Sequence, residues 1–374
     1  MRVLVLSAYD ADSHRRWYQT LMTAFDEYQW TLLSLPARYF SWRVRGNSLS
    51  WAFQQRAVLE RDYDLVIATS MVDLSALRGF VPSLATIPTL VYFHENQFAY
   101  PTSGQQFSTV EPQILNLYTA LAADRVVFNS AYNQSSFLQG VEALLAKLPD
   151  QVPMGLVDRL ARNSQVLPVP LEMNCFGSQP RSEPAPLQLL WNHRWEYDKA
   201  PERLFAALKI VLASDVAIKV HVVGQQFRQV PPVFAEMKTF FDSAYPASLG
   251  NWGYIEEPHR YRELLGQADV VISTALHDFQ GLAVMEAVAA GCVPLLPGRL
   301  CYPEWFGSDY LYSSYIQQPE QEAQQLADGI IALARSKQRG EMPLTEDLSA
   351  LSIERLKGEY AQLFAALIAV FYVN

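Results

Sequence analysis

The sequence predicts an α/β protein built from two Rossmann-like domains that face each other across a cleft. Its 374 residues are a length typical of two domains. Short, continuously apolar runs alternate with helical patterns in both halves, which indicates parallel strands covered on both faces. Residues 170–186 carry four prolines and a Gly-Ser pair, and this stretch between the halves is typical of a linker.

The first half, residues 1–170, is predicted to form one domain. Its expected strands are short and apolar: Val3–Leu6, Leu65–Thr69, Thr89–Phe93 and Arg125–Asn129. Helical patterns lie between them, for example Arg15–Phe25 and Ala131–Ala146. This order of strand and helix predicts βαβ units with a parallel sheet.

The second domain is expected over residues 187–350 and repeats this arrangement. Its predicted strands are Leu187–Trp191, Ile218–Val223, Val270–Ser273 and Val293–Leu296. Its predicted helices are Pro201–Ala213, His259–Gln267 and Leu282–Ala290. The last segment, residues 351–374, contains a long amphipathic helix at Ile353–Ala369. Pattern alone does not decide whether this helix returns to the first domain.

Composition excludes several classes of protein. A net charge of −9 is unusual for a general nucleic-acid binder, so any nucleic acid must bind to a local basic patch. The three cysteines form no CxxC motif, which argues against disulfides or structural zinc and fits a reducing compartment. The longest apolar run, Leu363–Val373, is shorter than the about 20 residues that span a bilayer. With no signal-peptide pattern at its start, the chain is expected to be cytoplasmic, without a membrane partner.

The most informative motif runs from His277 to Pro294, after a predicted strand. Gly281 marks a loop-to-helix junction, and the N–H groups of a helix that begins at Leu282 can bind a phosphate. Glu286, further along the helix, can accept hydrogen bonds from ribose hydroxyls. Asp278, eight residues before Glu286, is expected with His277 beside the sugar. This layout predicts a nucleotide-sugar site.

A second motif follows the strand at Leu187–Trp191. Arg194 and Lys199 lie in the loop before a predicted helix, where two cations would stabilise a leaving diphosphate in place of a metal. The alternative is a surface loop whose cations pair with neighbouring acids. Gly224, after the strand that contains His221, would let the backbone approach a phosphate or a base, although such a glycine can also be a simple turn residue.

Two further motifs lie at the ends of strands in the first half. His94 follows Thr89–Phe93, so it lies at the edge where open α/β sheets bind ligands. It would hydrogen-bond a sugar or relay a proton, or alternatively form a structural pair with Glu95. Asp10-Ala11-Asp12 has the DxD form of some metal-dependent transferases. We interpret it as a polar loop that leads into a helix near Ser13, so no metal is predicted.

The segment Ala37–Leu59 is basic and aromatic in an acidic chain, and it contains no acid. It carries Arg38, Arg43, Arg45, Arg56 and the aromatic residues Tyr39, Phe40, Trp42, Trp51 and Phe53. Arginine with flat aromatic rings suits phosphate contact and base stacking. The alternative is a surface loop whose rings pack into the first domain. The chain has no GxSxG, HExxH, Walker or GxGxxG motif, which excludes the commonest hydrolase, zinc-protease, P-loop and dinucleotide-binding sites.

The Arg194/Lys199 pair and the acid-x7-Glu helix resemble the retaining GT-B glycosyltransferases of family 4. That family usually has Glu where this chain has Asp278. Longer strings, from about Leu4 to about Phe306, resemble the tRNA-queuosine α-mannosyltransferase family. They are Trp42–Arg45, Tyr92–Gln97, Val127–Ser130, His193–Lys199, His221–Phe227 and His277–Gly281. One departure is the loop Asp10–His14, which keeps Ser13 and His14 but lacks the two glycines that this family tends to have before them.

The resemblance implies GDP-mannose as the donor and queuosine in a tRNA anticodon as the acceptor. It implies retention at the anomeric carbon, no cofactor and no metal. The first domain would bind the acceptor and the second the donor. On the acceptor side the resemblance implies Ser13, His14, His94 and Asn129 in the cleft, with Arg38, Arg43 and Arg45 on tRNA phosphates. On the donor side it implies Arg194, Lys199, Gly224, His277, Asp278, Gly281, Leu282 and Glu286.

Other functions remain open on sequence alone. A family 4 transferase with a polysaccharide or lipid acceptor would neither bind nor modify tRNA. A non-catalytic nucleotide-sugar or RNA-binding module would bind the donor without transfer. A GT-B-like epimerase would alter the nucleotide sugar without any acceptor. The base, the sugar, the oligomeric state and the role of the Asp10–Ser13 loop are not fixed by any motif.

Overall fold

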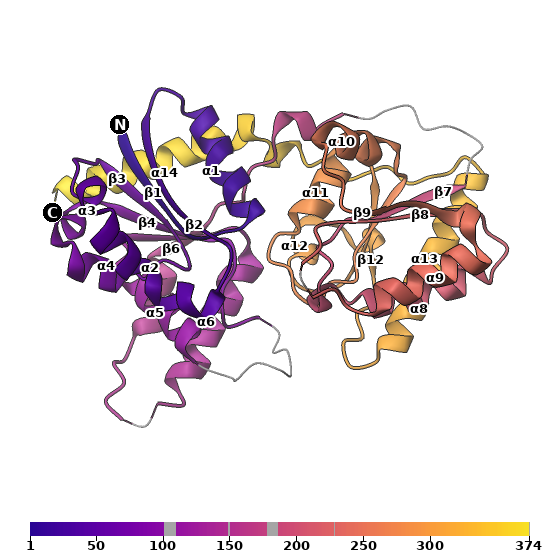
Figure 1. Ribbon diagram of the computed structural model, residues 1–374, viewed down its shortest axis with the longest axis horizontal. Helices are drawn as coiled ribbons and strands as arrows, with labels where there is room; N and C mark the ends of the chain where they lie inside the picture. The colour runs from indigo at the N-terminus through magenta and orange to yellow at the C-terminus, as the bar shows by residue number, and fades with distance from the viewer. Residues whose placement is uncertain (101–109, 149, 178–185, 228, 374) are drawn as a thin grey trace. The chain divides into compact units, whose positions relative to one another are not determined.

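The protein folds into two compact units (Figure 1). The structure, a computed structural model, describes residues 1–100, 110–148, 150–177, 186–227 and 229–373. The first unit joins Met1–Pro170 to Ile353–Asn374, and the second is Leu171–Ser352. Residues 178–185 of the predicted linker lie outside the described residues. Within the described part of the chain, no helix is long and apolar enough to cross a membrane.

A six-stranded parallel sheet forms the centre of the first unit, in the order β2-β1-β3-β4-β5-β6. Its strands are β1 (Arg2–Asp10), β2 (Gln29–Pro36), β3 (Leu65–Thr69), β4 (Thr89–Phe93), β5 (Arg125–Phe128) and β6 (Ser164–Val166). Every residue of the inner strands β3 and β4 is buried, because helices cover both faces of the sheet.

The helices of the first unit pack on both faces of this sheet. They are α1 (Asp12–Ala24), α2 (Phe40–Gln54), α3 (Arg56–Leu59), α4 (Leu74–Phe80), α5 (Glu111–Ala122), α6 (Ala131–Leu145), α7 (Leu156–Arg162) and α14 (Ile353–Val373). Figure 1 shows α1 and α14 on one face, with α2, α4 and α5 on the other. Apolar side chains from the sheet and from the second group of helices form one continuous core.

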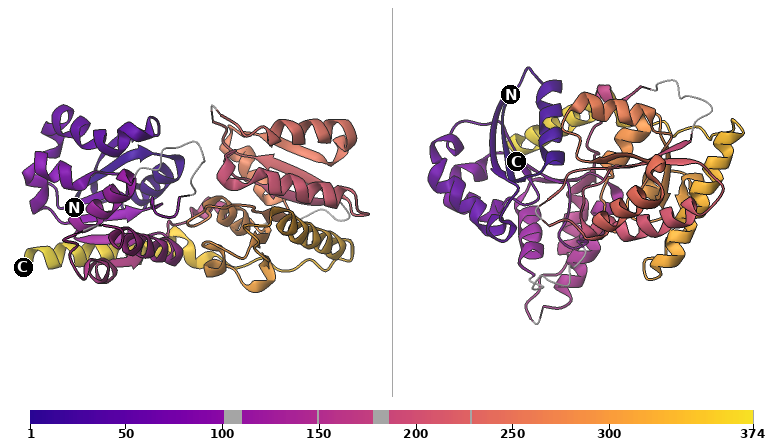
Figure 2. Two further views of the ribbon diagram at one scale, coloured as in Figure 1. Left: turned by 90° about the horizontal axis from the view of Figure 1, so that it is seen from below. Right: turned by 45° about the vertical axis from the view of Figure 1, so that its right-hand side comes forward.

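The last helix, α14, belongs to the first unit. In both views of Figure 2 this yellow helix lies against the elements of that unit. The buried Tyr360 on α14 accepts a hydrogen bond from the indole N–H of Trp17 on α1 at 3.1 Å, and donates one to the Pro168 carbonyl at 2.9 Å. The predicted helix at 353–369 is therefore present, and it packs on the first sheet.

The second unit also has a six-stranded parallel sheet, in the order β12-β11-β10-β7-β8-β9. Its strands are β7 (Leu187–Trp191), β8 (Ile218–Val223), β9 (Leu249–Gly253), β10 (Val270–Ile272), β11 (Val293–Pro297) and β12 (Leu311–Tyr312). Its helices are α8 (Pro201–Leu212), α9 (Val233–Ala244), α10 (Pro258–Gln267), α11 (Leu282–Ala289), α12 (Tyr302–Trp305) and α13 (Pro319–Gln338). Figure 1 shows α8, α9 and α13 on one face and α10 and α11 on the other.

The inner strands match the sequence prediction closely, and the edge strands were not predicted. Strands β3, β4, β7 and β8 have the predicted bounds. The strands absent from the prediction are β2, β6, β9 and β12, which lie at the edges of the two sheets. An edge strand needs no continuous apolar run, because part of it faces solvent: β2 alternates exposed with half-buried residues along most of its length.

Candidate active site

Two loops meet at the carboxyl edge of the second sheet. Strands β7 and β10 are hydrogen-bonded neighbours and run parallel, so the loops that follow them leave the sheet on the same side. The first loop leads from Trp191 into α8, and the second leads from Ile272 to Gly281 and α11. Ligands of open α/β sheets bind at this edge.

The N-terminus of α11 is formed by Gly281, whose φ of +76° lies in the left-handed region. A Cβ atom at this position would lie 3.0 Å from the ring of Tyr302, so a larger residue would be both strained and crowded. The N–H of Gly281 donates to Oδ1 of Asp278 at 3.1 Å. The eight-residue helix thus begins beside a carboxylate that is already held in place.

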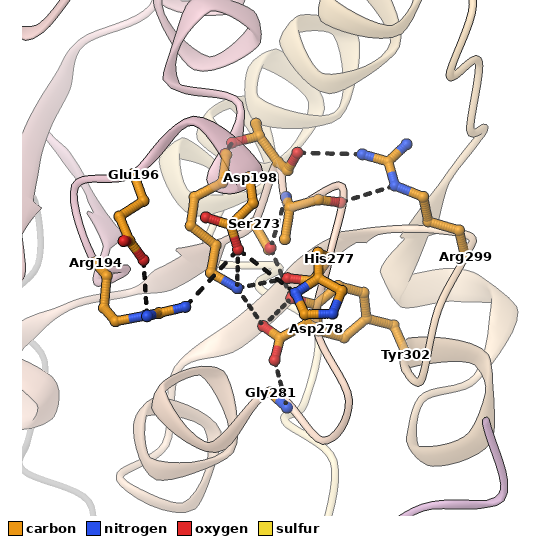
Figure 3. Close-up of polar contacts among 12 residues, drawn as sticks. Arg194, Glu196, Asp198, Ser273, His277, Asp278, Gly281, Arg299 and Tyr302 are labelled. Atoms are coloured by element: carbon orange, nitrogen blue, oxygen red, sulfur yellow. Dashed lines mark hydrogen bonds and ion pairs between the residues drawn. The ribbon is translucent and has the colours of Figure 1, made fainter. Parts of the chain in front are cut away.

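Ion pairs join five charged side chains into what we call the charged cluster: Arg194, Glu196, Asp198, Lys199 and Asp278. Figure 3 labels four of them, all except Lys199. Arg194 lies 2.7 Å from Glu196 and 3.8 Å from Asp198. The Lys199 ammonium lies 3.3 Å from Asp198 and 3.7 Å from Asp278. The alternative of ion pairs with neighbouring acids therefore holds for Arg194, but Lys199 also joins the two loops.

Lys199 is almost fully enclosed. It donates a hydrogen bond of 2.5 Å to the carbonyl oxygen of His277, and its own carbonyl accepts one from the Thr274 hydroxyl at 2.6 Å. The side chain of Asp198 is 3% exposed and lies 3.6 Å from Nδ1 of His277. A cation held this firmly between two loops is preorganised for an anion at the sheet edge.

The charges of this cluster are set by burial and by Lys199. Burial raises the pKa of Asp278, but the charge of Lys199 opposes it, and the pKa of this carboxyl lies below its ordinary value. The pKa of Asp198 is lowered in the same way. Burial, aided by Lys199, lowers the pKa of His193 to about 4, and burial also lowers the pKa of His277. At neutral pH the two carboxylates are therefore charged and the two imidazoles are neutral.

Three further donor-side residues of the prediction lie on α11 or directly after β8. Leu282 and Glu286 are half-buried on α11, and Gly224 directly follows β8. A Cβ atom on Gly224 would lie 1.8 Å from the carbonyl oxygen of His193. Glycine is therefore required there by the close approach of the loop after β7.

The first unit carries a second polar group at the carboxyl end of β4. The rings of His14, in the first turn of α1, and His94 stack at 4.2 Å between centroids; we call them the histidine pair. Nε2 of His14 lies 3.1 Å from Glu95. The sequence offered His94 as a possible partner of Glu95, but the structure pairs Glu95 with His14. The amide of Asn129 donates to the His94 carbonyl at 2.9 Å and thereby fixes the loop.

His94 is the most isolated polar group of this region. It is buried, and neither ring nitrogen has a hydrogen-bond partner in the described part of the chain. Trp17 packs edge-on against it at 4.8 Å, and Tyr92 packs against it at 4.7 Å. Burial, with His14 beside it, holds the pKa of His94 well below its ordinary value. A neutral imidazole with two unused nitrogens suits a hydrogen-bonding ligand.

The basic segment is helical rather than a loop: it forms α2 and α3. Arg43 is buried, and its Nε–H donates to a backbone carbonyl of β2 at 3.3 Å. Arg38 is exposed, and Arg45 is 58% exposed while it pairs with Asp73 at 3.2 Å. The exposed large apolar side chains of the segment are Tyr39, Phe40, Trp42, Leu49 and Phe53. Trp51 instead packs into the core.

Comparison with known proteins adds to this geometry. A profile described as "tRNA-queuosine alpha-mannosyltransferase N-terminal" matches residues 2–171. The tRNA-queuosine alpha-mannosyltransferase of Drosophila melanogaster is 31% identical over 321 residues, which are 83% of this chain and 83% of the relative. The chain belongs to the tRNA-queuosine α-mannosyltransferase family. The predicted family and the prediction of a glycosyltransferase are thus confirmed.

Solved structures confirm the fold class. HepE of Anabaena in complex with UDP and glucose matches 98% of this chain and 99% of its own, with a TM-score of 0.68 and 14% identity. Sucrose-phosphate synthase of Thermosynechococcus elongatus matches 99% of this chain and 100% of its own, with a TM-score of 0.64 and 13% identity. Two parallel six-stranded sheets with flanking helices are the GT-B architecture that was predicted.

Both acids of the Asp10-Ala11-Asp12 sequence interact with side chains of the first unit. Asp10 ends β1 and accepts hydrogen bonds from the side chains of Ser7, Arg15 and Tyr18. Asp12 starts α1 and lies 3.4 Å from Arg15. Among the described residues, no three His, Cys, Asp or Glu side chains gather as a metal site would require. The prediction that no metal takes part stays a prediction.

Sequence reasoning missed three side chains that organise the second unit's site: His193, Arg299 and Tyr302. The Arg299 guanidinium donates to the carbonyls of Thr274 at 3.1 Å and Ala275 at 2.8 Å, and so supports the loop before α11 (Figure 3). Arg299 and Tyr302 follow β11 at the carboxyl edge of the sheet, so the rule that found His94 would have found them. His193 directly precedes Arg194, and its Nε2 is buried without a hydrogen-bond partner among the described residues.

Proposed function

We propose that this protein transfers mannose from GDP-mannose to queuosine in the anticodon of a tRNA, with retention at the anomeric carbon. Family membership supports the acceptor and the sugar, because the Drosophila melanogaster relative is named for this activity. The observation that carries the proposal is the contact of Lys199, whose loop also carries Arg194, with Asp278 and the His277 carbonyl in the loop that leads to α11. A cytoplasmic location, where tRNA is found, is part of the proposal.

On the donor side, the diphosphate binds Arg194, Lys199 and the N-terminus of α11 at Gly281 and Leu282. Two cations and a helix N-terminus are suited to a diphosphate. Glu286, on the second turn of α11, accepts hydrogen bonds from ribose hydroxyls. His277 and Asp278 line the place of the transferred sugar, and Gly224 lets the neighbouring loop approach the nucleotide.

The transfer needs no protein nucleophile. The bond between the anomeric carbon and the diphosphate oxygen breaks, and Arg194 and Lys199 stabilise the charge that develops on that oxygen. The acceptor hydroxyl forms its new bond on the same face of the sugar, which gives retention. Its proton passes to an oxygen of the departing phosphate, so the products are GDP and the mannosylated acceptor. No metal or other cofactor is included in this scheme.

On the acceptor side, Ser13, His14 and His94 contact the queuosine diol, and Asn129 holds the His94 loop. The two unpartnered nitrogens of His94 support this assignment, because a diol supplies both hydrogen-bond donors and acceptors.

The surface beside α2 contacts tRNA. Arg38 and Arg45 are exposed and are assigned to phosphates, whereas the buried Arg43 supports the helix that carries Arg45. The exposed rings of Tyr39, Trp42 and Phe53 support stacking with unpaired anticodon-loop bases. The net charge of the chain, −9, does not favour nucleic-acid binding over the whole surface. Contact with tRNA is therefore expected at this local surface.

The deciding experiment incubates the protein with queuosine-containing tRNA and a panel of nucleotide sugars, followed by mass analysis of the nucleosides. A hexose added only from GDP-mannose supports the proposal. No added mass with any donor, or modification of tRNA that lacks queuosine, contradicts it. A second arm replaces Arg194 or Lys199 by Ala, which is expected to reduce turnover far more than tRNA binding. Equal loss of both would contradict the donor-side roles.

A further inference from the structure

Asp278 is engaged through both of its carboxylate oxygens. Oδ1 accepts the N–H of Gly281 at 3.1 Å, and Oδ2 accepts the hydroxyl of Tyr302 at 3.2 Å. Oδ2 also lies 3.7 Å from the Lys199 ammonium. One short side chain therefore links the N-terminus of α11, the loop after β7 and the loop after β11.

Tyr302 is placed for this link by its own packing. It is fully buried at the start of α12, and its ring lies against the backbone of Gly281, where a Cβ atom would be 3.0 Å away. Its hydroxyl lies 2.7 Å from Oγ of Ser273. Figure 3 shows the phenol ring reaching Asp278 from the side opposite Arg194.

The direction of these hydrogen bonds follows from the charge of Asp278. Lys199 keeps the carboxyl ionised, so it accepts only, and the Tyr302 hydroxyl must donate to it. The Ser273 hydroxyl must then donate to Tyr302, while it accepts the N–H of Ala275 at 3.2 Å. A directed chain of hydrogen bonds thus runs from the end of β10 to the carboxylate.

We propose that Tyr302 is a positioning residue of the donor site, which holds the Asp278 carboxylate so that it orients Lys199 and the N-terminus of α11 for the diphosphate. Asp278 then acts on the leaving group through Lys199 and α11, in addition to lining the place of the transferred sugar. This inference rests on the proposed function for the class of donor. It also explains how aspartate serves where related transferases usually carry the longer glutamate. The Tyr302 hydroxyl holds the shorter carboxylate in place, 3.7 Å from the Lys199 ammonium.

The test compares Tyr302→Phe with Tyr312→Phe, which is a matched control. Tyr312 is a buried tyrosine of the same unit, and its hydroxyl donates to the Ser273 carbonyl at 2.8 Å. In Tyr302→Phe the ring that packs on Gly281 stays, and only the hydroxyl that reaches Asp278 is lost. Thermal unfolding of each variant checks that both remain folded.

The expected result is a selective loss on the donor side. GDP binding, measured by calorimetry on the full chain, weakens about fivefold in Tyr302→Phe, and kcat falls by a similar factor. The KM for tRNA stays unchanged. The acid limb of the pH–rate profile moves to higher pH, because the Tyr302 hydrogen bond contributes to the lowered pKa of Asp278. Tyr312→Phe leaves all of these within twofold.

Coupling to Asp278 provides the second readout. In an Asp278→Asn background, Tyr302→Phe is expected to add little further loss, because the two residues act through one link. Rescue is expected from Asp278→Glu in the Tyr302→Phe background, since the longer side chain reaches Lys199 without the hydroxyl. Unchanged GDP affinity and pH profile in Tyr302→Phe, or losses that add to those of Asp278→Asn, would overturn the inference.

Failure of the proposed function is distinguishable from failure of this inference. If the unsubstituted protein binds UDP rather than GDP, the proposed donor is wrong, while the same comparison with UDP decides the role of Tyr302. If it binds GDP but modifies no tRNA, the acceptor is wrong and the binding comparison still decides. If it binds neither nucleotide, both proposals are overturned.

Discussion

The charged cluster of the second unit and the histidine pair of the first unit differ in how their polar groups are paired. In the charged cluster, Lys199 and Arg194 lie beside carboxylates, and ion pairs fix the position of each cation. In the histidine pair, His94 is neutral and buried, and its ring nitrogens have no hydrogen-bond partner in the described residues. Under the proposed function, the charged cluster holds its cations in place for an anion, while the hydrogen bonds of His94 are completed by a polar ligand.

The largest effect is expected from Lys199→Met. The change leaves Asp198 and Asp278 without the cation between them. It also removes a positive charge that would stabilise the leaving diphosphate. We expect kcat/KM for GDP-mannose to fall about 100- to 1,000-fold. Steady-state kinetics measure this directly. Lys337→Met is the control, because Lys337 is a buried lysine paired with Asp269 at 2.5 Å, away from the cluster. If both variants lost activity equally, the loss would reflect general damage to the unit.

Acid is expected to weaken the second unit through His193, which directly precedes Arg194. The pKa of His193 in the folded protein, about 4, lies below its ordinary value of 6.5, so protons bind the unfolded chain more tightly. Its contribution to stability is present above pH 6.5 and is lost as the pH falls toward 4. About 2 kcal/mol of it is lost by pH 5.

Urea unfolding of His193→Gln at pH 7 and pH 5 tests this expectation. The difference in unfolding free energy between the two pH values should shrink in this variant. The exposed His259 provides the control, and His259→Gln should leave the difference unchanged. An unaltered pH dependence in His193→Gln would show that other groups carry the acid sensitivity.

A smaller and more selective effect is expected from His94→Gln. If the unmade hydrogen bonds of His94 are completed by the acceptor, the KM for tRNA should rise about tenfold, while GDP affinity is unchanged. His221→Gln is the control: His221 is also a buried histidine, but both of its ring nitrogens are hydrogen-bonded, to Gln188 and Asn251. A change in GDP affinity with His94→Gln would break the division between the two regions.

The smallest effect is expected from Arg38→Ala. Loss of one exposed phosphate contact should weaken tRNA binding about threefold. The slope of log K against log salt concentration should become shallower by about 0.7. Filter binding at several salt concentrations measures both. Arg335→Ala, at an exposed arginine of the second unit, should change neither. A salt slope that is unaffected by Arg38→Ala would remove α2 from the tRNA surface.

The sequence predicted the inner strands well because their burial leaves a continuous apolar run. Strands β7 and β8 were found with their observed bounds, whereas β9 and β12 were missed, since edge strands can carry polar residues. The helix at α11 was recognised from Gly281, because a left-handed residue at a helix start leaves a readable signature. Each of these successes rests on information local to a few neighbouring residues.

The links within the site were less accessible from the sequence. The pairing of Arg194 and Lys199 with acids was open as an alternative, but the contact between Asp278 and Tyr302 spans 24 residues and two loops. The burial of Arg43 was also missed, because arginine is usually exposed, whereas on α2 this side chain reaches a carbonyl of β2. Such contacts depend on how strands order in the sheet, and no local pattern encodes that order.

The C-terminal helix α14 has a consequence for how the chain is made. Because Tyr360 supports Trp17, and Trp17 packs against His94, the first unit is not complete until the ribosome has synthesised the whole of the second. All of Leu171–Ser352 is synthesised before α14, so the N-terminal sheet lacks its last helix during that time. A fragment cloned at residue 170 would lack that helix, so the units cannot be separated there without damage. Circular permutation that joins α14 directly to residue 1 would let the first unit fold from contiguous sequence.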